Sequence, residues 1–169
     1  MDFETAYNAF LTAGAPIMAR LELRKFKHLA SASEETLWFR ADLWFDGRRV
    51  GYAQNDGHGG CTDYTLEPAA SAELHDLVDA IQNDHKFHLD VLIDHLVYAR
   101  VADDDWSRYH RRVCKGGGVT AFRLAMADTP AQDHSFANIR TTDPVKLAKT
   151  RADIAARGMI IRAEVPVLN

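Results

Sequence analysis

The chain has 169 residues, of which 47% are hydrophobic and 26% are charged, a composition typical of a globular protein long enough to enclose a core. Its formal net charge of -4 at pH 7 excludes a global positive field that would attract nucleic acid or an anionic membrane. The two cysteines, Cys61 and Cys114, lie far apart in the sequence, and we expect both to be reduced thiols.

The N-terminal residues indicate where the protein resides. Asp2 and Glu4 are acidic at positions where a secretory signal would be basic. No apolar run approaches the roughly 20 residues that a membrane-spanning helix needs. We therefore expect a cytoplasmic protein that does not associate with membranes.

The first predicted elements are a helix and a strand. Asp2 is a suitable N-cap for a helix with apolar residues at helical spacing, and Gly14 and Pro16 predict where it ends. Residues 17–24 then alternate between apolar and charged side chains, which is typical of a half-buried strand.

A β-hairpin between Leu37 and Asn55 is the clearest local prediction. Asp46-Gly47 is a favoured type I′ turn between two alternating runs, and pairing Phe45 with Arg48 sets the register. The further pairs in this register are Leu43 with Val50 and Ala41 with Tyr52. The side chains expected to point inward are Phe39, Ala41, Leu43, Val50 and Tyr52.

Helices follow a short third strand that spans Tyr64 and Leu66 and ends before Pro68. Ser71 is a suitable cap for a first helix, and a second carries the same apolar spacing. The sequence leaves open whether residues 82–86 separate the two. Three aspartates at 103–105 predict the start of another helix, which ends before the glycines at 116–118.

The last third of the chain predicts a strand over 119–126 and a loop around Thr129-Pro130. A helix then runs from Asp143-Pro144 to Gly158, and a final strand covers 159–167. Together these elements predict an α+β fold. We expect an antiparallel sheet of about five strands packed against several helices, in a single two-layer domain over residues 1–169.

The loop from Asn55 to Asp63 is the first candidate site. It brings two carboxylates, an imidazole and a thiol together with three glycines, and the residues that carry these groups are Asp56, Asp63, His58 and Cys61. Such groups could bind a metal or move a proton, and glycines can turn backbone N–H groups toward an anion. The alternative is a wide hairpin loop whose glycines serve conformation alone, in which case Gly57 or Gly59 has positive φ.

The segment from Asp46-Gly47 through Asn55-Asp56-Gly57-His58-Gly59-Gly60-Cys61 resembles one found in small uncharacterised proteins of bacteria and their mobile elements. The resemblance covers only the hairpin and its loop. It implies an accessory protein of a mobile element, and it carries over no activity, cofactor or catalytic residue.

The outward face of the hairpin is the second candidate site. Trp38, Arg40, Asp42 and Trp44 alternate on one strand, and Arg49 on the other can lie across Trp44. Tryptophan and arginine are the residues that most often anchor protein interfaces. The alternative is that a helix covers this face, with Arg40 and Asp42 paired at its edge.

Several familiar sites are not indicated. No Gly-x-Ser-x-Gly, Gly-x-Gly-x-x-Gly or Cys-x-x-Cys motif occurs in the chain. The helical histidines do not form a His-Glu-x-x-His pattern, and glycines 116–118 follow a helix instead of preceding one. We therefore predict no resident metal and no cofactor.

Two hypotheses about function remain open. The first is a non-enzymatic binding or regulatory protein that holds a protein partner through the hairpin face and the loop, and it requires Trp38 and Trp44 to be accessible. The second is a small hydrolase or nucleotide-binding protein whose site is the Asp56–Asp63 loop, with or without a metal. Nucleic-acid binding is disfavoured, because acidic residues interrupt the basic patch. That patch consists of Arg20, Arg24, Arg40, Arg48 and Arg49.

Overall fold

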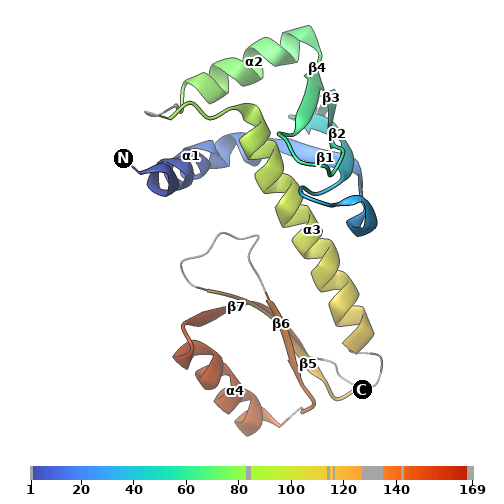
Figure 1. Cartoon of the computed structure of the whole chain (residues 1–169). Coiled ribbons are helices and arrows are strands. Elements are labelled where there is room, and N and C mark those ends of the chain that lie inside the picture. The colour runs from blue at the N-terminus through green and yellow to red at the C-terminus, as the bar shows by residue number, and fades with distance from the viewer. Residues whose placement is uncertain are drawn as a thin grey trace. The chain divides into compact units, whose positions relative to one another are not determined.

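The computed structural model describes residues 2–82, 85–113, 115, 117–126, 135–141 and 143–166 (Figure 1). Within these ranges the chain forms four α-helices, a short 3-10 helix and seven strands. The strands make two antiparallel sheets, of four and three strands. The α+β class is confirmed, whereas one sheet of about five strands is not found. The reason is that the fifth strand pairs with the two strands that follow it and not with the four that precede it.

The contacts within the chain divide it into two compact units, Met1–Val97 (unit 1) and Tyr98–Asn169 (unit 2). Each unit has its own sheet and its own cluster of buried apolar residues. Because the sequence pattern shows which faces are apolar but not how many cores they form, the single domain over 1–169 stays a prediction. No described helix combines the length and apolar character needed to cross a membrane.

Unit 1 is built on the four-stranded sheet, in the order β1-β2-β3-β4. Its elements are α1 (Phe3–Met18), β1 (Leu21–His28), η1 (Ala30–Ala32), β2 (Phe39–Phe45), β3 (Arg48–Asn55), β4 (Asp63–Leu66), α2 (Pro68–Asp79) and the first part of α3 (Leu89–Val113). The three helices lie on the same side of the sheet (Figure 1). Their fully buried residues include Phe10, Leu74 and Ile93, which share one core with Leu43 of β2.

Helix α1 begins as predicted but ends later. The Asp2 side chain accepts a hydrogen bond from the Thr5 N–H at 2.9 Å, which confirms the cap. The predicted end at Gly14 and Pro16 is wrong, because the helix continues to Met18. Gly14 instead allows a close approach to α3: a Cβ there would lie 2.7 Å from Leu92 Cδ2.

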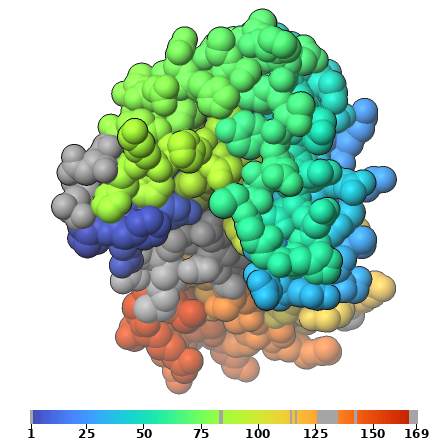
Figure 2. Space-filling model, turned by 45° about the horizontal axis from the view of Figure 1, so that its top comes forward, coloured from blue at the N-terminus to red at the C-terminus, as the bar shows by residue number. Residues whose placement is uncertain are grey.

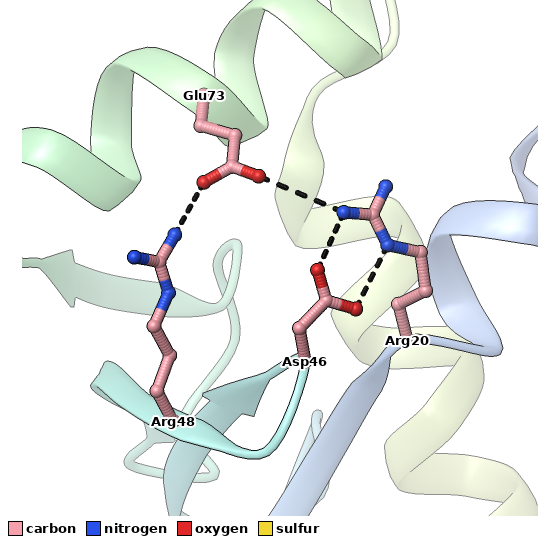
Figure 3. Close-up of polar contacts among 4 residues, drawn as sticks. All are labelled: Arg20, Asp46, Arg48 and Glu73. Carbon is pink, nitrogen blue, oxygen red and sulfur yellow. Dashed lines mark hydrogen bonds and ion pairs between the residues drawn. The ribbon is translucent and has the colours of Figure 1, made fainter.

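The hairpin turn is confirmed and is held by charged side chains. Asp46 and Gly47 have φ values of 48° and 75°, as a type I′ turn requires. Arg20 donates two hydrogen bonds to the Asp46 carboxylate, at 2.9 and 2.6 Å, and this contact lowers the pKa of Asp46 (Figure 3). Glu73 of α2 lies 3.6 Å from Arg20 and 2.5 Å from Arg48. The turn is thereby joined to α2.

The predicted hairpin register is correct only next to the turn. Phe45 pairs with Arg48, but the register shifts between Leu43 and Trp44, so that Leu43 lies opposite Gly51. Val50 is thus an extra residue in β3, a β-bulge that reverses the alternation beyond it. Tyr52 consequently points outward and is 43% exposed, which contradicts its predicted inward position. The inward prediction is confirmed for Phe39, Ala41, Leu43 and Val50.

Two helix boundaries also differ from expectation. Ser71 lies inside α2, which begins at Pro68, since proline fits the first turn of a helix. Residues 103–105 do not start a helix, because α3 is continuous from Leu89 to Val113. Two of these aspartates pair with arginines one turn away within the helix: Arg100 lies 3.6 Å from Asp104, and Arg108 pairs with Asp105. The question over residues 82–86 is settled, since α2 ends before them and α3 begins after them.

Unit 2 contains the three-stranded sheet, in the order β6-β5-β7. The strands of this sheet are β5 (Thr120–Met126), β6 (Ser135–Ile139) and β7 (Met159–Pro166), and helix α4 (Pro144–Ala156) lies between β6 and β7 in the chain. The predicted ends of α4 are confirmed: the Asp143 side chain accepts from the Val145 N–H at 2.9 Å, and Gly158 has a φ of 72°. The loop predicted around Thr129-Pro130 lies outside the described residues.

Candidate functional site

The candidate site is the face of the four-stranded sheet that points away from the helices of unit 1. We name it the open face. Because side chains alternate along a strand, residues next to the buried ones point outward here. The open face comprises Arg24, Lys25, Lys27, Arg40, Asp42, Trp44, Arg49, Tyr52 and Gln54. Within unit 1, no described helix packs against it, so the expected alternative of a covering helix is not found there.

Both tryptophans of the predicted site are half-buried. The guanidinium of Arg24 lies over the Trp44 ring, 3.8 Å from its centroid, and Arg40 lies 5.6 Å from the ring of Trp38. Arg49 does not stack on Trp44 as expected. The rings are therefore neither enclosed in the core nor fully accessible.

A depression of about 390 Å³ lies on the open face. Asp42 lines this depression, and its carboxylate lies 2.9 Å from Lys25 and 3.4 Å from Arg49. The hydrogen bond from Lys25 lowers the pKa of Asp42, so this carboxylate stays ionised at neutral pH. The other polar or aromatic side chains that line the depression are Lys27, Arg40, Tyr52 and Gln54.

The glycine-rich loop is organised by one buried amide. Asn55 is only 7% exposed, and its Oδ1 accepts hydrogen bonds from the Thr36 hydroxyl at 2.6 Å and the Gly57 N–H at 2.9 Å. The Gly57 carbonyl in turn accepts from three successive N–H groups, of residues 34–36. Within the loop, the N–H groups of Gly57 and Gly59 donate to Asn55 and Thr36, so these two groups are not available to an external anion.

The predicted positive φ of the loop glycines is confirmed. Gly57 has a φ of +83° and Gly59 a φ of +96°, in the region that side chains rarely adopt. In the space-filling view, β3, the loop and β4 reach the surface beside α2 (Figure 2). The glycines thus allow the backbone of the loop to adopt a conformation that other residues rarely adopt.

The chemical groups of the loop are not brought together. Asp56, His58, Cys61 and Asp63 are all exposed, and His58 Nδ1 lies 3.2 Å from the Glu34 carboxylate outside the loop. Within the described residues, no group of three or more His, Cys, Asp or Glu side chains is placed to hold a metal ion. The second hypothesis, an enzymatic site in this loop, thus gains no support from the geometry.

Two arginines of the proposed nucleic-acid patch lie elsewhere. Arg20 and Arg48 form the ion pairs with Asp46 and Glu73 that join the turn to α2 (Figure 3). They therefore do not extend the basic surface of the open face, which contains Arg24, Arg40 and Arg49.

A polar contact that the sequence does not indicate joins the loop to α3. The Thr62 hydroxyl donates to Asp94 Oδ1 at 2.5 Å. Burial raises the pKa of Asp94, and the hydrogen bond from Thr62 offsets part of the rise. The two residues are 32 positions apart, so no sequence spacing could have revealed the pair.

Asp94→Asn is expected to stabilise the protein at neutral pH. A carboxyl whose pKa is raised by folding binds its proton more tightly in the folded state, so its effect on stability becomes unfavourable as the pH rises through that pKa. Asparagine keeps an acceptor for Thr62 and removes the charge. Urea denaturation near pH 7 should show the gain, and it should disappear at about pH 3, below the usual pKa of aspartate. The exposed Asp56→Asn variant is the control, and an equal gain there would contradict the assignment to burial.

Comparison with known proteins yields no relative: no family model, curated protein or solved structure matches the chain. The resemblance of the hairpin to bacterial mobile-element proteins therefore stays a prediction.

Proposed function

We propose that the chain is a non-enzymatic binding protein and that the open face of unit 1 receives a protein partner. The observation that carries the proposal is that α1, α2 and α3 pack on one side of the sheet and leave aromatic and charged side chains on the other. Tyr52 is 43% exposed and Trp44 is half-buried, in a surface that also bears arginines. Such a mixture of aromatic rings and arginine is enriched at interfaces. The resemblance of the hairpin to mobile-element proteins adds to this proposal that the chain is an accessory protein of a mobile element.

The loop contributes to the proposal as a support for the sheet. Asn55 closes the loop at the end of β3, and Thr62 ties it to Asp94. Fixed strand ends hold the side chains of the open face in place before a partner arrives, which lowers the entropy lost on binding.

A photo-crosslinking amino acid at position 52 tests this function. In lysate of the cells that naturally contain the protein, we expect it to yield an adduct of discrete mass, because Tyr52 lies on the open face. The same substitution at Tyr98 is a matched control, since this tyrosine of α3 is 42% exposed. Equal adducts at both positions, or none at position 52, would contradict the proposal.

A further inference from the structure

The charges of the open face are balanced everywhere except at two positions. Arg24 lies 2.9 Å from Glu22, and Lys25 and Arg49 both contact Asp42. Lys27 and Arg40 have no carboxylate partner among the residues that the structure describes. Both side chains are exposed and line the depression.

The strand register places these two cations side by side. Lys27 of β1 pairs directly with Arg40 of β2. Like charges opposite each other destabilise a sheet, whereas the neighbouring pair of Arg24 with Asp42 joins opposite charges. The Lys27–Arg40 pair thus opposes folding, and an anion bound between the two would remove the repulsion.

The rest of the depression favours a peptide over a polyanion. Tyr52 offers an exposed aromatic ring, and Gln54 can both donate and accept hydrogen bonds. Three carboxylates neutralise the other cations of this face: Glu22 pairs with Arg24, Asp42 with Lys25 and Arg49, and Glu67 with Arg49. The unbalanced positive charge is thus confined to two adjacent residues. A nucleic-acid backbone carries a phosphate at every nucleotide, and these carboxylates would repel the phosphates.

We infer that this depression binds an acidic segment of the partner protein, with Lys27 and Arg40 receiving its carboxylates and Tyr52 contacting an adjacent apolar side chain. The inference rests on the proposed function and names the chemistry that the open face recognises. Arginine binds a carboxylate through two parallel hydrogen bonds, and lysine adds a point charge.

The test uses a short fluorescent peptide of Glu-Glu-Leu repeats and a matched peptide of Gln-Gln-Leu repeats, with binding followed by fluorescence anisotropy. We expect the full chain to bind the Glu peptide and to bind the Gln peptide at least tenfold more weakly. The double variant Lys27→Gln/Arg40→Gln should lose at least tenfold in affinity for the Glu peptide. Its melting temperature should not fall, because the substitutions remove a repulsion.

The control is Lys146→Gln/Arg162→Gln, which makes the same change in charge at two exposed residues of unit 2. It should bind the Glu peptide as the unmodified chain does. Equal weakening by both double variants, or equal binding of both peptides, would overturn the inference. Tighter binding of a labelled oligothymidine, with the same loss in the Lys27→Gln/Arg40→Gln variant, would overturn it in favour of nucleic acid.

The crosslinking experiment separates this inference from the proposed function. An adduct at position 52 that persists in the Lys27→Gln/Arg40→Gln variant would retain the open face as the interface and reject the acidic segment. Loss of that adduct together with loss of Glu-peptide binding is the result that supports both.

Discussion

Gly57→Ala is expected to lower the free energy of unfolding by roughly 3 kcal/mol or more, whereas Gly60→Ala should lower it by only about 1 kcal/mol. The two glycines have similar φ values, +83° and +90°. A Cβ at Gly57 would lie 2.1 Å from the carbonyl oxygen of Ala32, while a Cβ at Gly60 would meet nothing within 4 Å. The backbone strain is thus shared, and only Gly57 adds a steric clash.

Urea denaturation of the two variants measures the difference directly. Because residues 34–36 donate to the Gly57 carbonyl, the clash at Ala32 should also free this segment, and amide exchange at Glu34 and Glu35 should accelerate. Equal losses for the two variants would mean that strain alone governs the loop and that its packing on residues 32–36 contributes little.

Gly51→Ala should be comparably destabilising, by about 3 kcal/mol or more, for a different reason. A Cβ at Gly51 would lie 2.0 Å from the carbonyl oxygen of Thr65 on β4. Since this oxygen belongs to the backbone of a paired strand, relief requires β3 and β4 to separate. Gly47→Ala in the same hairpin is the control, because its Cβ would meet nothing within 4 Å.

The same variant reports on the pairing of β3 with β4. Gly51 lies opposite Leu66, and the close approach to Thr65 is a contact between these two strands. Amide exchange in β4 should therefore accelerate together with the fall in the urea midpoint. A Gly51→Ala protein as stable as the Gly47→Ala protein would contradict the close packing of β4 against β3 at Gly51.

The sequence predicted well the turns and helix ends that depend on neighbouring residues. Asp46-Gly47 in the turn, the Asp143 cap and Gly158 at the end of α4 each depend on residues within a few positions of one another. Conformational needs of this kind are visible in a single chain, as is the positive φ of Gly57.

Pairing between distant segments was not visible. Val50 is apolar and buried, so an alternation pattern accepts it in either register, and only its partners on β2 reveal the bulge. In the same way, Asp103 to Asp105 resemble a helix start until their partners are known: Asp104 and Asp105 pair with arginines one turn away inside α3, and Asp103 pairs with Arg123 of β5. The expected single sheet was wrong for the same reason, because only the partners of β5 show that it begins a second sheet.

The candidate site was predicted in part. Alternation along β2 identified Arg40 and Trp44, and these do lie on the open face. The contribution of Lys27 was missed, because the predicted strand ends at residue 24, whereas β1 continues to His28 after the register shift between Arg24 and Lys27. The unbalanced pair of Lys27 and Arg40 therefore became apparent only from the strand register.

The irregularity of β1 also determines how the sheet meets other chains. Strand β1 is at one edge of the sheet, and Lys25 within it has a φ of 51°. At the other edge, β4 is only four residues long. A kinked, lysine-bearing strand and a very short one are poor templates for edge-to-edge association, the route by which exposed strands aggregate. A second chain is thus directed to the side chains of this sheet instead of to its backbone, and the edges of the four-stranded sheet should resist pairing with strands of other chains.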